Sequence, residues 1–500
     1  MSLVPHMDQL SLSDKTGFSF AVPAEQPNFT FAVPSACKME QQESHPHLQL
    51  LADNSHTAET TGSIPIFRPG LLAPAQSGLL GVDITRAHMD RNEVLKHRLF
   101  YNVSDPTSTF ICGSQGSGKS HTLSSILENC LIPCKANYLP RPLAGLVFHY
   151  DTFISDTGGM PCEAAYLSSD PAVSVRVLCA PSNIGNIKQR IYAGLPNVTV
   201  QPLRIDQRDL NTSRMLDLMA ANSIKGGSLP LYLHVIQRIL RDMRIAQQKT
   251  NSGFDYKTFK RLVDAEDLKE GQIVPLQQRL DTLESFMDPA QTSATGKIPK
   301  VKAGIEWKLK AGQLTIVDLS CPCVTAEAAC SLFNICLSIF LEQDSKDSKI
   351  GRIVALDEAH KYMNDSSDSQ TLTESLLSVI RLQRHLGTRV VLSTQEPTIS
   401  PKLLDLCSTV IVHRFTSPAW FGVLRKHLAG VSRDDSDQRA YCENLFSQIV
   451  ELKTGEALLF CPSALVTVGI TGHGKLGNGA MKIRVRQRVT EDGGKSIMAD

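Results

Sequence analysis

The pattern of apolar and polar positions predicts an α/β fold for this chain. Apolar runs of strand length recur along it, and helix-like amphipathic segments separate several of them. The runs that we interpret as strands lie at residues 110–112, 143–151, 174–178, 199–205, 312–320, 352–356, 388–394 and 410–412, and helices are expected at 87–97, 325–341 and 372–386. Strands alternating with helices are typical of a parallel sheet flanked by helices.

Two regions depart from this alternation. The N-terminal region is rich in Ser, Pro, Gln and His, a composition typical of disorder. A later region carries amphipathic helical patterns followed by a polar linker, which indicates a helical insertion. The predicted organisation is a disordered tail (1–62), the first part of the core (63–206), the helical insertion and linker (207–302), the second part of the core (303–475) and a C-terminal strand and tail (476–500).

The tail contains a short duplication. Residues Phe18–Pro23 and Phe29–Pro34 share the pattern FxFAVP. Chance similarity within a disordered tail is the favoured interpretation. The alternative is a two-copy docking motif that recruits protein partners.

The segment between Thr107 and Leu127 contains the motif with the clearest chemistry. Gly113–Ser120 matches G-x-x-x-x-G-K-[ST] and lies between a strand-like run and a helix-like segment, as a phosphate-binding loop requires. Glycines let backbone N–H groups converge on phosphate, and the following helix adds its positive N-terminus. Lys119 is expected to reach the β- and γ-phosphates and Ser120 to ligate Mg²⁺. The residues predicted to bind ATP are Gly113, Ser114, Gln115, Gly116, Ser117, Gly118, Lys119, Ser120 and His121.

Two carboxylates complete the predicted site. The apolar run 352–356 is followed by Asp357 and Glu358, and carboxylates at the end of a buried strand need a partner or a metal. Asp357 is expected to hold Mg²⁺, and Glu358 to orient and deprotonate the attacking water. We therefore predict a P-loop NTPase core of the RecA-like (ASCE) type that hydrolyses ATP with Mg²⁺. Asp151, at another strand end, is either an additional metal-site acid or a turn former, while His360 receives no role.

The apolar run 388–394 ends at Gln395. A strand that neighbours both the P-loop strand and the Asp-Glu strand would place Gln395 near the γ-phosphate. We interpret Gln395 as a residue that senses this phosphate.

Composition adds few constraints. The chain is 42% hydrophobic and has 51 Lys+Arg against 50 Asp+Glu, so nucleic-acid binding would need a local basic patch. The 13 cysteines form no recognisable zinc spacing, and we expect reduced, mostly buried thiols. No apolar run reaches the ~18 residues of a membrane span, and no targeting pattern is visible. The expected location is the cytoplasm or nucleus, with no membrane association.

The C-terminal region is read as strands. Glu456–Phe460 and Val466–Ile470 suggest a closing hairpin. In Lys482–Arg488, basic residues alternate with mostly apolar ones, which places four cations on one face of a strand. This is either a protected edge strand, the interpretation that we prefer, or an anion-binding stripe.

The motifs resemble those of the HerA/FtsK superfamily of P-loop ATPases, which includes hexameric DNA pumps and conjugation motors. The resemblance rests on Gly113–Ser120, Ile353–His360 and the block from Arg384 through Gln395 to Arg414. It implies that Arg384 or Arg414 serves as the arginine finger of a neighbouring subunit, and that Gln395 is catalytic together with Glu358 and Lys119. Two features depart from the family: Glu396 stands where many members have arginine, and the first 90 residues leave no room for the HerA-type N-terminal β-barrel.

Two functions remain open at this stage. The leading one is a ring-forming ATPase motor, with a hexamer as one candidate, acting on DNA or another polymer threaded through its pore. The other is a nucleotide-dependent switch or scaffold that recruits protein partners. Net charge of +1 favours the switch, whereas the paired acids and arginines favour the motor.

Overall fold

The computed structural model describes residues 63–493, except 86–89, 220–230, 293–303, 344–349, 428–435 and 469–471. The duplicated FxFAVP motif and the start of the expected helix 87–97 therefore lie outside the described residues. All described residues belong to one of the two compact units of the chain, Thr61–Asp500.

The elements of the described part follow in chain order. The strands are β1 (Ile66–Phe67), β2 (Ser77–Asp83), β3 (Arg98–Asn102), β4 (Ser108–Cys112), β5 (Asn137–Tyr138), β6 (Ala144–His149), β7 (Ser174–Cys179), β8 (Val198–Pro202), β9 (Gln313–Asp318), β10 (Arg352–Leu356), β11 (Thr388–Thr394), β12 (Thr409–Val412), β13 (Glu456–Phe460), β14 (Leu465–Val468), β15 (Gly472–Lys475) and β16 (Met481–Val485). The α-helices are α2 (Arg91–Lys96), α3 (Lys119–Leu131), α4 (Ile184–Asn186), α5 (Thr212–Leu218), α6 (Leu231–Thr250), α7 (Tyr256–Asp264), α8 (Glu270–Ser285), α9 (Pro289–Thr292), α10 (Ala326–Glu342), α11 (Ser367–Leu386), α12 (Pro401–Leu406), α13 (Pro418–His427) and α14 (Ser436–Val450).

The centre of the sheet is parallel. Its strands follow the order β12-β4-β11-β10-β6-β9-β7-β8, and every neighbouring pair for which pairing is described runs in the same direction. In β11, Leu392 pairs with Leu356 of β10 while Thr394 pairs with Cys112 of β4. The carboxyl ends of these three strands therefore meet at one edge of the sheet. The predicted parallel α/β sheet, with the Gln395 strand between the other two, is confirmed.

Beyond β12 the sheet becomes antiparallel except for the parallel pair of β1 and β14, and here two predictions are wrong. β13 pairs with β12 and β16, whereas β14 pairs with β1 and β15, so β13 and β14 form no hairpin. β16 pairs with β13 on one side and β2 on the other, so it is an interior strand and not an edge. The reason is long-range pairing: β2 comes from the N-terminal part of the chain and covers the side that the sequence left open.

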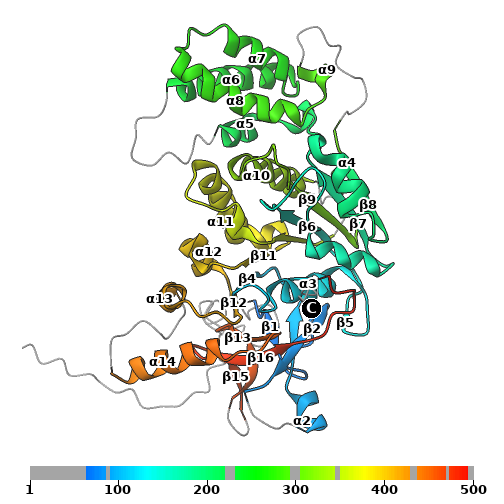
Figure 1. The fold of residues 1–500 in the computed structure, drawn as a ribbon, viewed down its shortest axis with the longest axis vertical. Helices are drawn as coiled ribbons and strands as arrows, with labels where there is room; N and C mark the ends of the chain where they lie inside the picture. The colour runs from blue at the N-terminus through cyan, green and yellow to red at the C-terminus, as the bar shows by residue number, and fades with distance from the viewer. Residues whose placement is uncertain are drawn as a thin grey trace, which may run out of the picture. The chain divides into compact units, whose positions relative to one another are not determined.

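Helices cover both faces of the parallel strands. α10 and α11 lie on one face and α3 on the other (Figure 1). Successive residues of β4 show the division, because Phe110 belongs to the core beneath α10 and α11, and Ile111 to the core beneath α3. Both are fully buried, which explains why the central strands contain continuous apolar runs in place of an alternating pattern. The helices α6, α7 and α8 share the core of α10 and α11.

The four C-terminal cations form no anion-binding stripe. Lys482 lies 3.1 Å and Arg484 3.5 Å from Glu456. The next two, Arg486 and Arg488, pair with buried Glu128 on α3, and Arg488 also pairs with Glu163. Each cation thus has an acidic partner within the chain and the strand is interior, so neither interpretation of this stretch holds. The segment after β16 is instead tied to the helix that follows the P-loop.

Within the described part of the chain, no helix combines the length and apolarity needed to span a bilayer.

Candidate active site

The P-loop leaves β4 in a conformation that only its glycines accept readily. Gly116 and Gly118 have φ values of 69° and 112°, in the left-handed region. At Gly113, where φ is 154°, a Cβ atom would come within 2.6 Å of the His413 side chain. The loop can therefore pass closely over β12 and enter α3 at Lys119.

Residues from two other segments hold this loop. Both the backbone N–H and the hydroxyl of Ser114 donate to the carbonyl of Arg414, each at 2.8 Å. Backbone N–H of Gly455 donates to the carbonyl of Ser117 at 3.2 Å. The loop is thus fixed by the end of β12 and by the turn before β13, neither of which its motif includes.

A buried histidine beneath the loop was missed from the sequence. Nδ1 of His413 lies 2.9 Å from the carbonyl of Glu456, which can only accept, so Nδ1 carries the proton. Nε2 then accepts from the hydroxyl of Thr122 at 2.9 Å. Burial lowers the pKa of His413 to about 4, which keeps the ring neutral in this arrangement. Its only sequence signal was its position at the end of an apolar run.

Lys119 lies at the start of α3 and is almost fully buried. Its Nζ donates to the carbonyl of Ser114 at 3.1 Å, so the side chain folds back over the loop. Burial lowers the pKa of Lys119, and the nearby carboxylates of Glu358 and Asp357 oppose that shift. The ammonium is therefore held between the loop and the acidic pair, where phosphate oxygens would complete its contacts.

The acidic pair occupies the end of β10. Asp357 continues the strand, since its N–H donates to the carbonyl of Phe148 at 3.0 Å. Glu358 then adopts a left-handed conformation, with φ 47° and ψ 45°. This conformation is unfavourable for a residue with a Cβ atom, and such strain is concentrated at functional sites. It turns the Glu358 side chain away from the strand direction and toward the P-loop residues.

Glu358 is a carboxylate in an unfavourable environment. Burial raises its pKa, the adjacent Asp357 raises it further, and Lys119 opposes the change. Nδ1 of His360 lies 3.3 Å from Oε2 of Glu358, and burial lowers the pKa of His360 to about 4. A neutral histidine beside the predicted base was not assigned a role from the sequence, where it looked like an ordinary helix-start residue.

Gln395 joins the two halves of the site. Its Nε2 lies 3.3 Å from Oε2 of Glu358 and 3.2 Å from Oε1 of Gln115 in the P-loop. Its backbone N–H points toward Nδ1 of His360 at 3.4 Å. A side chain that contacts both the phosphate-binding loop and the acidic pair is placed to respond to a ligand between them.

The residues present fit a magnesium ion. Oδ1 of Asp357 is buried and has no hydrogen-bond partner among the described residues. Ser120 lies in the first turn of α3, next to Lys119. Mg²⁺ is bound by oxygen ligands, usually one or two from protein together with phosphate and water. Asp357 and Ser120 supply that donor type, and the free carboxylate oxygen marks the place where a cation would compensate its charge.

Of three other predicted residues, Arg414 and His121 lie beside the P-loop or on its helix, whereas Arg384 lies far from it. Arg414 is exposed beside its own P-loop, since its carbonyl binds Ser114. Arg384 is exposed near the end of α11, and α11 leads into the start of β11. The site lies at the other end of β11. Since this strand has seven residues, its start lies about 20 Å from the site. His121 faces the C-terminal segment, with Nε2 2.8 Å from the carbonyl of Arg486. Arg384 therefore cannot reach the site of its own chain.

Asp151 behaves as a turn former. Its Oδ1 accepts from the N–H of Phe153 at 2.9 Å and lies 3.1 Å from Nζ of Lys361. Burial raises its pKa, but these two partners outweigh that effect and the net pKa is lowered. The structure thus supports the strand-end turn among the two alternatives.

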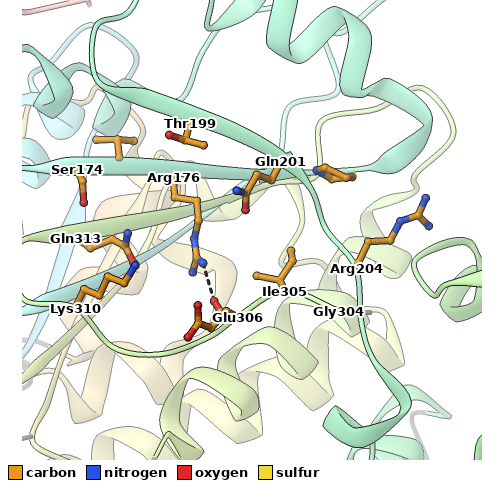
Figure 2. A pocket seen from close by; sticks show the side chains of 12 residues that line it. Ser174, Arg176, Thr199, Gln201, Arg204, Gly304, Ile305, Glu306, Lys310 and Gln313 are labelled. Atoms are coloured by element: carbon orange, nitrogen blue, oxygen red, sulfur yellow. Dashed lines mark hydrogen bonds between the residues drawn. The ribbon is translucent and has the colours of Figure 1, made fainter. Parts of the chain in front are cut away.

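A separate hollow lies at the β7–β8 side of the sheet. Figure 2 shows its lining, with Arg176 reaching toward Glu306, and its volume is about 510 Å³. Arg176 donates to the carbonyl of Glu306 at 2.7 Å and to Oγ1 of Thr315 at 3.1 Å. Arg204 donates to the carbonyl of Met287 at 3.0 Å. Two of the three cations at this hollow, which also include Lys310, are therefore engaged in holding the fold.

Together, the P-loop, the acidic pair and the intervening strand β11 define a P-loop NTPase fold of the RecA-like (ASCE) type. No protein-family model matches the chain, and no curated protein matches it.

Among solved structures, the chain is similar to VirB4 of Thermoanaerobacter pseudethanolicus, with a TM-score of 0.48 and 11% identity over 82% of this chain and 96% of that one. It is also similar to the plasmid coupling protein TrwB in complex with a GTP analogue, with a TM-score of 0.43 and 12% identity over 84% and 97% of the chains. For the genome packaging NTPase B204 from Sulfolobus turreted icosahedral virus 2 in complex with ATP-gammaS, the TM-score is 0.28 and the identity 8% over 71% and 92%. Because the identities and TM-scores are low, the chemistry is inferred from the site alone.

Proposed function

We propose that this protein binds ATP with Mg²⁺ and hydrolyses it. The observation that carries the proposal is the convergence of Lys119, Asp357, Glu358 and Gln395 at one edge of the sheet, from three adjacent strand ends. The unpartnered Oδ1 of Asp357 and the strained backbone of Glu358 support a catalytic assignment.

Each residue of the site has a distinct task. The P-loop N–H groups and Lys119 bind the β- and γ-phosphates, and Asp357 and Ser120 hold Mg²⁺, which neutralises charge developing on the phosphates. Glu358 accepts a proton from the attacking water, a task that its raised pKa suits, because a base with a pKa closer to neutral holds that proton better. Gln395 holds the Glu358 side chain in position relative to the P-loop.

At the level of the assembly, we propose a ring-forming motor that acts on DNA or another polymer. The resemblance to the HerA/FtsK superfamily supports it, as does the position of Arg384, which is exposed and too far from its own site to act there. The switch or scaffold is the second candidate. One observation favours it: all four cations of residues 482–488 are paired within the chain, which removes the basic stripe that would bind a nucleic acid.

The proposal of ATP hydrolysis can be tested by measuring nucleotide binding and phosphate release with purified variants. Lys119→Ala should lose binding of both ATP and GTP in calorimetry, whereas Glu358→Gln should bind nucleotide, release no phosphate and trap it. Lys402→Ala is the matched control, because Lys402 forms an exposed pair with Glu374 on α11. Wild-type protein that neither binds nucleotide nor releases phosphate would contradict the proposal. Turnover stimulated by DNA would favour the motor, and slow turnover unaffected by polymers would favour the switch.

A further inference from the structure

A second cluster of metal-ligating side chains shares Asp357 with the acidic pair. His149 ends β6, Cys162 precedes a short 3₁₀ helix, and Asp357 follows β10. Phe148 pairs with Leu356 in the parallel register, so the next residues, His149 and Asp357, lie side by side. One ligand atom from each member of the cluster lies within 4.8 Å of the other two, the only such His/Cys/acid group found among the described residues.

The distances in this cluster match those between ligands of a tetrahedral zinc ion. Bond lengths of about 2.3 Å to sulfur, 2.05 Å to nitrogen and 2.1 Å to oxygen give separations of about 3.6 Å for S–O pairs and 3.4 Å for N–O pairs. Sγ of Cys162 lies 3.7 Å from Oδ2 of Asp357. Nδ1 of His149 lies 3.3 Å from the same oxygen. Both separations to Asp357 therefore suit one shared ion, and the donor atoms of His149 and Cys162 lie within 4.8 Å of each other.

Hydrogen bonding satisfies this cluster only in part: the thiol of Cys162 donates to Oδ2 of Asp357, whereas the ring of His149 has no hydrogen bond. All three side chains are nearly or fully buried. Neither ring nitrogen of His149 has a hydrogen-bond partner in the described structure, because Nδ1 faces Asp357 outside hydrogen-bond geometry. Buried polar atoms normally find hydrogen-bond partners, so an imidazole that makes no hydrogen bond and faces a carboxylate at 3.3 Å, beside a thiol, indicates a missing ligand.

We propose that His149, Cys162 and Oδ2 of Asp357 form a binding site for Zn²⁺, distinct from the magnesium position at Oδ1. The donor set selects the metal: a thiol, which loses its proton on binding, and an imidazole suit zinc, whereas Mg²⁺ requires oxygen ligands. Three protein ligands leave a fourth position for water or another donor.

The shared carboxylate connects this site to the nucleotide site. A zinc ion on Oδ2 withdraws negative charge from the oxygen assigned to Mg²⁺ and fixes the orientation of Asp357. When zinc is bound, nucleotide binding should therefore depend less on the negative charge of Asp357. Nucleotide binding by the protein would in this way respond to zinc. This consequence rests on the proposed function, but the metal binding itself does not.

Titration of the metal-free full chain with Co²⁺, followed by displacement with Zn²⁺, tests the site. Wild-type protein should show a thiolate-to-cobalt charge-transfer band that saturates near one equivalent. Cys162→Ser and His149→Gln should weaken binding at least about a hundredfold, since removal of a ligand exceeds the tenfold to hundredfold effect of its supporting contacts. Cys179→Ser is the matched control, because Cys179 is an equally buried thiol on β7. Lys119→Ala should bind cobalt normally, which separates this site from nucleotide binding.

Equal cobalt affinity of wild-type, Cys162→Ser and His149→Gln proteins would overturn the proposal. Since a buried substitution can impair folding, X-ray absorption of the zinc-loaded wild-type protein provides a second measurement. One sulfur with two or three nitrogen or oxygen ligands supports the site. A shell with several sulfurs, or with none, overturns it.

Discussion

The side-chain amide of Gln395 lies 3.3 Å from Oε2 of Glu358, and the same nitrogen lies 3.2 Å from Oε1 of Gln115. A single side chain thus links the proposed base to the phosphate-binding loop. β11 makes this link possible because it separates the P-loop strand from the Asp-Glu strand.

Gln395→Ala should reduce kcat by about a hundredfold while nucleotide affinity stays unchanged. The variant leaves the phosphate-binding groups in place but releases Glu358, and a misplaced catalytic group costs on the order of 10² in rate. Phosphate release and calorimetry measure the two effects. Gln448→Ala, at an exposed position of α14, is the control, and a Gln395→Ala enzyme with wild-type kcat would refute the link.

Glu358→Gly should be more stable than Glu358→Ala by about 1 kcal/mol, although both lose turnover. Only glycine accepts φ 47° without steric cost. Urea denaturation measures the difference. At Glu374, inside α11, the order should reverse because alanine is the better helix former. Equal stabilities of the two Glu358 variants would mean that the backbone there is not strained.

Arg384→Ala should lose turnover but keep ATP affinity, since an arginine finger contributes ~10³–10⁵ in rate. Mixing it with Lys119→Ala subunits should restore part of the activity, because each subunit supplies what the other lacks. The same experiment with Arg414→Ala distinguishes the two arginines. Arg414 lies beside its own P-loop, so mixing Arg414→Ala with Lys119→Ala subunits would restore activity only if Arg414 acts on the site of a neighbouring subunit.

Dilution provides the control for this assembly. Activity per subunit should fall as the protein dissociates, whereas constant activity in a demonstrably monomeric range would exclude a finger from another subunit.

Glu128→Gln should lower the free energy of unfolding by about 3 kcal/mol. Glu128 is fully buried, and the substitution leaves the nearly buried cation of Arg486, 2.7 Å away, without its charge partner. Glu374→Gln is the matched control, because its pair with Lys402 is exposed and should contribute less than about 1 kcal/mol. Similar losses in the two variants would contradict the role of the C-terminal segment in holding α3.

Acidification should destabilise the protein through His413. Burial lowers the pKa of this histidine from 6.5 to about 4, so the folded protein binds the proton less tightly than the unfolded chain. The stability contributed by the neutral ring is complete above pH 6.5 and is lost as the pH falls through about 4. Between pH 7 and 4, wild-type protein should therefore lose about 3 kcal/mol more than His413→Gln.

The exposed His234 supplies the control for this measurement. His234→Gln should retain the pH dependence of the wild-type protein, followed as the free energy of unfolding. If His413→Gln also retains it, the ring is not held neutral by the fold.

The sequence by itself determined those elements that are specified by neighbouring residues along the chain. An apolar run followed by Gly113–Ser120 specifies strand, loop and helix, and Asp357, Glu358 and Gln395 follow apolar runs directly. Because parallel strands present their carboxyl ends at one edge, the predicted site could be assembled without coordinates.

Only the tertiary structure decided which strands and charges meet. β16 is an interior strand because β2, distant in sequence, covers one side of it, and Arg486 is neutralised by Glu128 on α3. His149 likewise meets Asp357 through strand register, and Cys162 reaches the same carboxylate from the segment before Glu163–Ser169. Contacts between residues hundreds of positions apart depend on the complete packing of the sheet, and no local pattern of apolar and polar residues encodes them.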